Sequence, residues 1–572
     1  MPTDRDLLSL FDSRLLSQPD MPLYSFLDRD GAVRQSLTVA SLFEQARDLA
    51  GVLQAYGLRR QAVVLLYPHG SEFIVAFFAA LLAGAYPVPV ARPRGRDWRV
   101  LTGIIRASRA GALLTLSATA RHLPAELTVG ELLQIVHTDN LPARRTDRMA
   151  RWQRSVPESR DIAFIQYTSG STSVPKGVEI THAGILHNCE LIAEAFACRG
   201  PDIGVSWLPF HHDMGLIGHV ITPLYCGIHN YFLAPADFAA SPVRWLQAIS
   251  RYRGTISGAP DFAYDHCHSR VTEEELTALD LRSWRLAYCG AQRVSADTLR
   301  KFAARFGRSG FAAQAWHPCY GLAEATLYVC SRQGLLTHRQ KGRLGQTERE
   351  DVSIGALNGR VDIRIVNTEA VRGVAEGEVT EVEVAEGEVA EGEIGEILVR
   401  SAALGNGYHR DAVSTAATFD VGMTGFLRTG DLGYIHEGNL YFTGRCKTLI
   451  KRRGRSFHAE DIEAEVEALL CGKGVERSAA FELNPNAADS LVILLEADGS
   501  VDPRLIELSI PVLQSRLCQS PGILATDIVV APRHSLPLTS SGKLQRMRCR
   551  ERYLAGDYLN RADKECEHEK EF

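Results

Sequence analysis

A segment near residue 170 combines hydroxyl side chains, glycine and a lysine in a pattern suited to binding a polyphosphate. The sequence YTSGSTSVPKGV, residues 167–178, follows an apolar strand-like run and precedes a helical pattern. A backbone N–H at Gly170 can approach an anion closely, and Lys176 supplies positive charge. The hydroxyl donors of the segment are Thr168, Ser169, Ser171 and Thr172. A P-loop is excluded, because Pro175 and Gly177 flank the lysine; the remaining alternative is a merely flexible loop.

Two later segments carry polar groups that suit nucleotide chemistry. Residues 428–431 read RTGD, and the basic run GRCKTLIKRRG follows at 444–454. A carboxylate such as Asp431 can accept hydrogen bonds from both hydroxyls of a ribose. Near the C-terminal end, TSSGK places Lys543 in a turn, from which its ammonium can reach into a cleft. Taken alone, RTGD is a weak signal, and Lys543 is more typical of a solvated surface charge.

The elements that must position these groups are predicted by the alternation of apolar runs and helical patterns over the first 440 residues. We expect strands at 61–67, 111–116 and 162–168 and a helix near 71–83, which indicates an α/β fold with buried strands. The uncharged stretch 73–91 is long enough to suggest a membrane span. Gly84, Pro87 and Pro89 interrupt it, so we expect a buried helix followed by a short strand and no membrane insertion.

The C-terminal part of the chain has a different pattern. Residues 374–397 contain nine glutamates and three AEGE repeats without a lysine or arginine, which is typical of a solvent-facing hairpin or a mobile loop. Beyond residue 444, the helical pattern EDIEAEVEALL and the strand-like runs LVILLEA and DIVVAP indicate a small α+β module. We therefore predict two domains: a large one at 1–444, made of several subdomains, and a small mobile one at 445–572 that carries Lys543.

Composition excludes several classes of protein. The chain has 572 residues, of which 45% are hydrophobic and 23% charged, as expected of a globular protein that buries a large core. A net charge of -5 argues against a general nucleic-acid or anionic-membrane binder. The twelve cysteines form no C-x-x-C pair, so no zinc ribbon is expected. The N-terminal residues lack the apolar core of a secretory signal, and we expect a cytoplasmic protein.

Taken together and in this order, the motifs resemble those of the adenylate-forming superfamily of acyl-CoA synthetases, luciferases and peptide-synthetase adenylation domains. Five motifs are in register between residues 20 and 555: YTSGSTSVPKG, WLPFHHDMGLIG, YGLAEAT, RTGD with GRCKTLIKRRG, and TSSGK. Within this superfamily the chain most resembles the fatty acyl-AMP ligases. The segments that match the motifs of that branch are LPFHHDMGLIG, PLYCG, APDFAYDHC and YGLAEATLYV.

The resemblance implies a two-step reaction. A fatty acid carboxylate attacks the α-phosphorus of MgATP to give acyl-AMP and pyrophosphate, and a thiol then takes the acyl group. By resemblance, residues 168–172 and Lys176 bind the β- and γ-phosphates, and Glu324 carries the magnesium ion. Lys543 bridges the carboxylate and the α-phosphate, and His212 lies beside the acyl carboxylate. The alternative for His212 is a core histidine, and for Glu324 a helix cap or ion pair.

The resemblance also implies the nucleoside site and the hinge. Tyr320 stacks on adenine, and Asp431 and Arg445 bind the ribose. The adenine site is completed by Gly290, Ala291, Gln292, Gly321 and Leu322. Lys447 matches the hinge about which the C-terminal domain turns between the two half-reactions. The acceptor implied is the phosphopantetheine arm of a separate acyl carrier protein.

Several positions depart from the family pattern. Gln292 stands where a carboxylate is usual, Thr448 where an acidic residue is usual, and Ala459 where a proline is usual. The insertion that hinders transfer to CoA in the fatty acyl-AMP ligases is present near 331–353 but shortened. An acyl-CoA or aryl-CoA ligase is therefore the first alternative. A non-catalytic adenylate-binding relative is the second, although Lys176, Glu324 and Lys543 are all present.

Overall fold

The computed structural model describes residues 6–93, 98–124, 127, 133–141, 152–168, 175–341, 348–367, 387–419, 425–452, 455–470, 472–483, 490–519, 525–538 and 544–558. Its largest sheet has eight strands, of which the central six are parallel and the two at the edges antiparallel. In spatial order they are β14 (Tyr328–Ser331), β13 (Trp316–Gly321), β12 (Leu286–Cys289), β11 (Ile256–Ala259), β9 (Ile203–Ser206), β10 (His229–Phe232), β1 (Pro22–Leu27) and β2 (Val33–Thr38).

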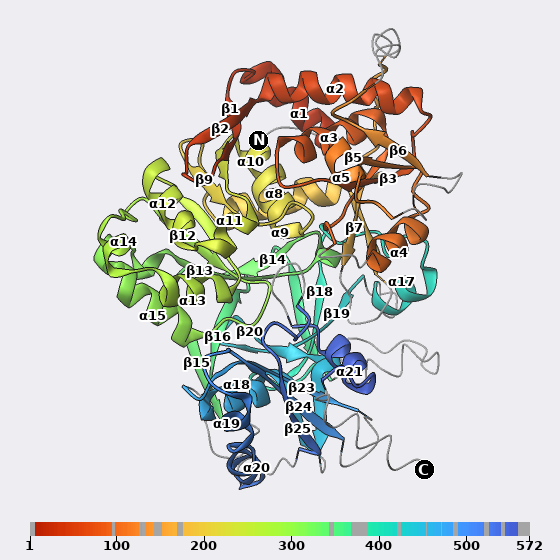
Figure 1. The fold of residues 1–572 in the computed structure, drawn as a ribbon. Coiled ribbons are helices and arrows are strands. Elements are labelled where there is room, and N and C mark those ends of the chain that lie inside the picture. The colour runs from red at the N-terminus through yellow and green to blue at the C-terminus, as the bar shows by residue number, and fades with distance from the viewer. Residues whose placement is uncertain are drawn as a thin grey trace.

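A second, wholly parallel sheet and a hairpin accompany the large sheet (Figure 1). The sheet comprises β4 (Tyr86–Pro89), β3 (Ala62–Leu66), β5 (Ala112–Thr115) and β6 (Gln134–His137). The hairpin pairs β7 (Ile162–Thr168) with β8 (Lys176–Thr181). The helices up to residue 306 are α1 (Leu7–Ser17), α2 (Val39–Ala55), α3 (Ser71–Ala83), α4 (Arg99–Ser108), α5 (Ser117–Ala120), α8 (His182–Ala195), α9 (Asp213–Leu216), α10 (Thr222–Cys226), α11 (Pro235–Ala240), α12 (Val243–Tyr252), α13 (Asp261–Arg270), α14 (Glu273–Thr277) and α15 (Ala296–Phe306).

Helix α3 shows how local sequence sets the elements of this part. Its residues are apolar on every face and almost all buried, as in a core helix. It ends at Gly84, whose φ of 73° is left-handed and suits a residue without a Cβ. The short strand β4 follows at once, so the predicted helix and strand within 73–91 are confirmed. Among the described residues, no helix is long and apolar enough to cross a membrane.

An antiparallel six-stranded sheet follows in the chain. Its strands, in spatial order, are β15 (Thr337–Lys341), β16 (Glu348–Ala356), β20 (Asn439–Arg445), β19 (Leu427–His436), β18 (Gly395–Arg400) and β17 (Asp362–Val366). The short insertion near 331–353 thus forms a β-hairpin whose second strand joins β20. Most of the glutamate-rich segment lies outside the described residues. Its Glu396, however, is fully buried in β18 and accepts a 2.8 Å hydrogen bond from Arg428, so it does not face solvent.

The C-terminal part has its own small sheet and its own core. Strands β23 (Val475–Glu482), β24 (Leu491–Ala497) and β25 (Asp527–Ala531) form the sheet, and β21 (Leu449–Arg452) pairs with β22 (Arg455–His458). The helices are α17 (Ala412–Thr418), which precedes this part, and α18 (Ala459–Leu469), α19 (Pro503–Glu507), α20 (Ile510–Gln519) and α21 (Arg546–Leu554). Two apolar clusters between 450 and 558 are distinct from those between 7 and 440. Figure 1 shows this part beside β15, β16 and β20. The predicted mixed α/β class with a small α+β C-terminal portion is confirmed.

Candidate active site

The parallel strands of the large sheet bring several of the predicted residues to one edge. His212 follows β9, Gly290 follows β12, and Tyr320 and Glu324 lie at and beyond the end of β13. Because parallel strands end at the same side of a sheet, these groups share one rim, where α/β proteins bind ligands. Residues 431 and 445 reach the same region from β19 and β20, as the contacts below show.

The hairpin of β7 and β8 positions the predicted phosphate-binding lysine. Thr168 and Lys176 are cross-strand partners at the end of the hairpin where the two strands are connected. Residues 169–174 between them lie outside the described residues, and with them the predicted Ser169, Gly170, Ser171 and Thr172. The predicted helix is α8, and β8 lies between it and this segment, paired with β7 and largely buried.

Tyr408 joins Lys176 to Glu324, although sequence analysis did not single it out. The Lys176 ammonium lies 4.8 Å from the centre of the Tyr408 ring and donates a 2.7 Å hydrogen bond to Ser414 Oγ. The Tyr408 hydroxyl donates to Glu324 Oε1 at 2.9 Å. Burial raises the pKa of Glu324 above its usual range, and the hydrogen bond from Tyr408 opposes that shift. No local pattern marks this lone aromatic residue, which only the fold brings to the site.

Glu324 is a suitable single ligand for magnesium, but it does not form a complete metal site. Among the described residues, no group of three or more His, Cys, Asp or Glu side chains could hold a metal ion. Magnesium is often bound through one or two carboxylates together with the phosphates of a substrate. The residues present therefore fit a magnesium ion that arrives with a nucleotide.

A buried carboxylate lies at the centre of the predicted nucleoside site. Asp431, only 2% exposed, accepts a 2.8 Å hydrogen bond from the Tyr320 hydroxyl. Its second oxygen lies 2.9 Å from Arg445 Nε, and the two residues are cross-strand partners on β19 and β20. Burial, and then the charge of Asp431, raises the pKa of Tyr320 well above its usual range, so the phenol stays a donor. The Phe442 ring lies nearly parallel to that of Tyr320, with ring centres 6.3 Å apart.

The predicted adenine segment is held by close packing between β12 and β13. A Cβ on Gly290 would meet the carbonyl oxygen and sulfur of Cys319 at 2.7 Å, so only glycine fits there. Ala291 adopts a left-handed φ of 69°, which turns the chain toward Gln292. At Gly321, a Cβ would collide with the carbonyl oxygen of Leu327. Leu322 follows and is buried.

His212 is not a core histidine. It caps the N-terminus of α9, its side chain is 25% exposed, and its Nδ1 lies 2.5 Å from Asp213 Oδ1. A carboxylate beside one ring nitrogen fixes the orientation of the imidazole. The described contacts of His212 thus leave Nε2 as the nitrogen for a ligand.

The predicted hinge lies between the two parts of the molecule. Lys447 is in a 3₁₀ turn, Cys446–Thr448, that joins β20 to β21. Burial, and then the positive charges of Lys176 and Arg445, lowers the pKa of Lys447 below its usual range. Lys543 lies outside the described residues.

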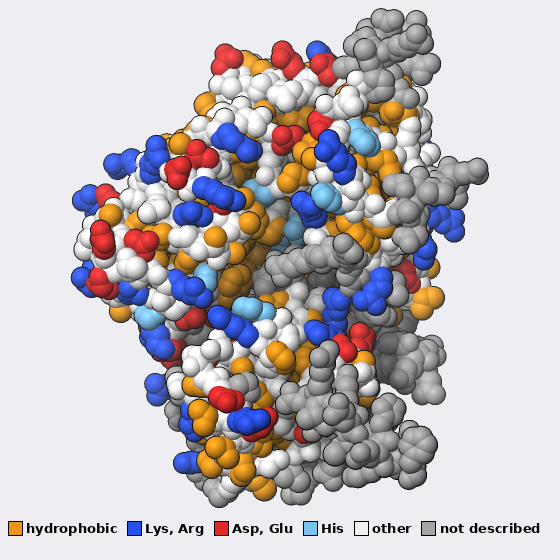
Figure 2. Space-filling model, in the orientation of Figure 1, with side chains coloured by type: hydrophobic (Ala, Val, Ile, Leu, Met, Phe, Trp, Pro, Cys, Tyr) orange, Lys and Arg blue, Asp and Glu red, His pale blue; other side chains and the backbone are white. Residues whose placement is uncertain are grey.

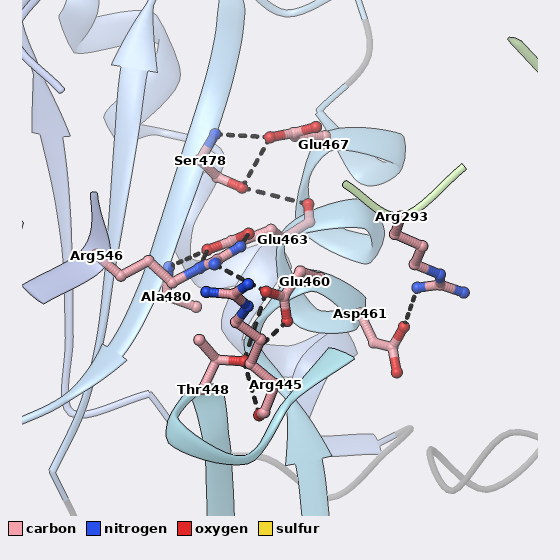
Figure 3. A network of polar contacts seen from close by, with 10 residues as sticks. All are labelled: Arg293, Arg445, Thr448, Glu460, Asp461, Glu463, Glu467, Ser478, Ala480 and Arg546. Carbon is pink, nitrogen blue, oxygen red and sulfur yellow. Dashed lines mark hydrogen bonds and ion pairs between the residues drawn. The ribbon is translucent and has the colours of Figure 1, made fainter. Parts of the chain in front are cut away.

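Side chains of α18 connect the C-terminal part to its surroundings (Figure 3). Asp461 lies 2.5 Å from Arg293 of the large N-terminal part, and Arg293 also contacts the fully buried Asp351 of β16 at 3.2 Å. Glu460 contacts Thr448 at 3.3 Å and so provides a carboxylate where the family's usual acidic residue is replaced. Ala459 occupies the first position of α18, where proline is common but not required.

Comparison with known proteins agrees with this geometry. The chain matches the family described as AMP-binding enzyme over residues 11–409. It is 34% identical to the medium-chain-fatty-acid–[acyl-carrier-protein] ligase JamA of Moorena producens, over 96% of this chain and 95% of JamA.

Solved structures of this kind also superpose on the chain. One, from a study of fatty acyl-adenylate ligases from E. coli and L. pneumophila, is 32% identical with a TM-score of 0.85, covering 98% of this chain and 99% of that one. Another, of a fatty acyl-adenylate ligase from L. pneumophila with acyl adenylate and pyrophosphate, is 29% identical with a TM-score of 0.72 and 96% coverage of each chain. The chain therefore belongs to the AMP-binding enzyme family, and within it to the fatty acyl-AMP ligases.

Proposed function

We propose that this protein uses ATP to activate a fatty acid as its acyl-adenylate, releases pyrophosphate, and transfers the acyl group to the phosphopantetheine thiol of a separate acyl carrier protein. The observation that carries the proposal is the convergence of Lys176, Tyr408 and Glu324 next to the Tyr320–Asp431–Arg445 group. A cation and a carboxylate that suit a metal-bound triphosphate thus adjoin a buried acceptor that suits a ribose. The likeness to ligases of the same kind supports it.

The residues around the nucleotide have separate tasks in this proposal. Asp431 accepts hydrogen bonds from the ribose hydroxyls, and Arg445 holds one of its oxygens by an ion pair. Tyr320 offers its ring face to adenine while its hydroxyl stays on Asp431. Lys176 and residues 168–172 neutralise the β- and γ-phosphates, which are the leaving pyrophosphate. Glu324, together with the phosphates, would hold a magnesium ion, which would supply further positive charge to the triphosphate.

The acid is activated when one of its carboxylate oxygens attacks the α-phosphorus and the bond to the bridging oxygen of pyrophosphate breaks. Lys543 places its ammonium between the attacking carboxylate and the α-phosphate, where negative charge gathers in the transition state. His212 Nε2 orients the carboxylate. Both residues are assigned by motif, and the partly exposed imidazole of His212 at the N-terminus of α9 supports its assignment.

The second half-reaction requires the C-terminal part to move. We infer that residues 1–444 and 445–572 are the two domains, because their apolar clusters are separate and a single turn at Lys447 joins them. Lys543 then enters for adenylation and leaves for thiol transfer. We place the reaction in the cytoplasm.

The acceptor decides between this function and its alternative, an acyl-CoA or aryl-CoA ligase. Purified protein, MgATP and saturated fatty acids of six to eighteen carbons should be analysed by mass spectrometry alone, with CoA, and with a phosphopantetheinylated acyl carrier protein. We expect acyl-AMP that persists with CoA and acyl transfer to the carrier. Acyl-CoA as the main product would establish the alternative, and no acyl-AMP from any acid would refute fatty acid activation.

The role of Lys543 can be isolated by the two half-reactions. Lys543→Ala should lower acyl-AMP formation by at least about 100-fold, because the transition state loses a positioned cation. The same variant should transfer acyl groups from supplied acyl-AMP at close to the normal rate. Lys301→Ala is the matched control, since that lysine pairs with Asp297 on the surface of α15. Equal loss of both half-reactions would contradict the assignment.

A further inference from the structure

Two histidines meet where the parallel sheets adjoin. His69 follows β3 of the four-stranded sheet, and His211 lies in the loop between β9 of the eight-stranded sheet and α9. The His69 ring stacks on Phe210, with ring centres 3.9 Å apart and planes at 21°. The position next to His212 puts this group beside the proposed carboxylate site. Figure 2 shows a hollow at the place of α9, and histidine side chains line it.

Both imidazoles are neutral at physiological pH. Burial, and then the neighbouring His211, lowers the pKa of His69 to about 3. Burial, and then the neighbouring His212, lowers the pKa of His211 to about 3. A neutral imidazole has one N–H donor and one acceptor nitrogen. Both side chains nevertheless keep partial exposure, as expected of the wall of a hollow. Such a wall suits an uncharged polar group rather than an anion.

Two buried polar atoms at this wall have no hydrogen-bond partner among the described residues. One is His69 Nε2, and the other is Oε1 of Gln166, a β7 residue that is only 3% exposed. The Gln166 amide donates a 2.9 Å hydrogen bond to the His211 carbonyl oxygen, which fixes its side chain against the same loop. Buried polar atoms without partners are destabilising and uncommon in native proteins.

Aromatic rings pack around His69. Phe73 and Phe232 pack on Phe210, with ring centres 5.4 and 4.8 Å away, and Phe232 also faces His69. An alkyl chain on this wall would cover the aromatic rings but leave both polar atoms unsatisfied. A hydroxyl group would satisfy them, because it donates one hydrogen bond and accepts another.

We propose that His69 and Gln166 recognise a hydroxyl group close to the carboxyl end of the acid, so that the preferred substrates are 3-hydroxy fatty acids. The proposal rests on the proposed function and deepens it by naming the substrate class. The place of the hydroxyl follows from His211, which adjoins both His69 and the proposed carboxylate neighbour His212. His69 and Gln166 act here as specificity-determining residues.

The test compares matched acids by pyrophosphate release. Octanoate, 3-hydroxyoctanoate and 8-hydroxyoctanoate are assayed. Dodecanoate, 3-hydroxydodecanoate and 12-hydroxydodecanoate form the second set. We expect kcat/KM to be at least about 10-fold higher for each 3-hydroxy acid than for the plain acid, and no gain for the terminal hydroxyl, because only a hydroxyl near the carboxylate reaches the two atoms.

Variants of His69 test whether this residue causes the preference for 3-hydroxy acids. His69→Phe should reduce the ratio of kcat/KM for 3-hydroxy acid to that for plain acid to within about 2-fold of one, a ratio that is read within the same variant. His69→Gln, which retains a donor and an acceptor, should restore part of the ratio. His187→Phe is the matched control, because this partly buried histidine of α8 lies beside Glu190.

The outcomes separate this inference from the proposed function. A wild-type enzyme that prefers the plain acids, or a ratio unchanged in His69→Phe, would overturn the hydroxyl site and leave fatty acid activation intact. Absence of pyrophosphate release with all six acids would refute the proposed function itself. The wild-type ratio decides the matter even where the phenylalanine variant does not fold.

Discussion

The hydrogen bond between Tyr320 and Asp431 offers a test of the nucleoside site that removes a single oxygen atom. In Tyr320→Phe, the ring that we propose faces adenine remains, but Asp431 loses a donor 2.8 Å away at a position that is 2% exposed. Hydrogen bonds to charged groups contribute about 1.5–3 kcal/mol. If the hydrogen bond contributes this much free energy to the binding of ATP, its loss lowers kcat/KM for ATP by about 10- to 150-fold.

The magnitude is best measured as a double-mutant cycle. In an Asp431→Ala background the tyrosine hydroxyl has no carboxylate to orient, so Tyr320→Phe should then cost less than about 3-fold. The assay is ATP–pyrophosphate exchange with a fixed saturating acid, over a range of ATP concentrations. The difference between the two backgrounds gives the coupling free energy, expected at about 1.5–3 kcal/mol.

Additivity would refute this reasoning. If Tyr320→Phe lowers kcat/KM for ATP by the same factor in both backgrounds, the hydroxyl does not act through Asp431. Tyr434→Phe is a useful control, because its hydroxyl contacts Asp351, a buried carboxylate outside the proposed nucleoside site.

Two further perturbations test the interdomain contact and a titrating carboxyl. Asp461→Asn removes the 2.5 Å ion pair with Arg293 but keeps the Arg293–Asp351 contact. We expect the C-terminal part to dock on the N-terminal part about 1 kcal/mol more weakly, and trypsin to cleave between residues 445 and 455 several-fold faster. An unchanged cleavage rate would contradict a docking role for this ion pair. Burial raises the pKa of Asp261 to about 7. The folded protein therefore keeps a proton that the unfolded chain releases near pH 4, and stability falls as pH rises from about 4 to 7. Asp261→Asn lacks this loss, so its Tm relative to wild type should be higher at pH 8 than at pH 5; a constant difference would disprove the assignment.

Local patterning was sufficient for several elements of the N-terminal part. The apolar run of α3 ends at Gly84, and the strand predicted at 162–168 has those bounds in the structure. Buried strands and core helices are recognisable because each is a continuous apolar run of typical length, with Gly, Pro or polar residues at its ends. The pairing of strands was not predictable in this way. The joining of β16 to β20, for example, depends on a partner far along the chain.

The sequence alone determined the chemistry that this protein offers. The order of YTSGSTSVPKG, YGLAEAT and RTGD indicated an adenylate-forming enzyme, because these motifs resemble those of that superfamily in the same order. Only the tertiary structure decided which groups touch. Tyr320 and Asp431 are 111 positions apart, and Tyr408 and Glu324 are 84 apart. Contacts of this range form when sheets pack against each other, and no local period in the sequence encodes them.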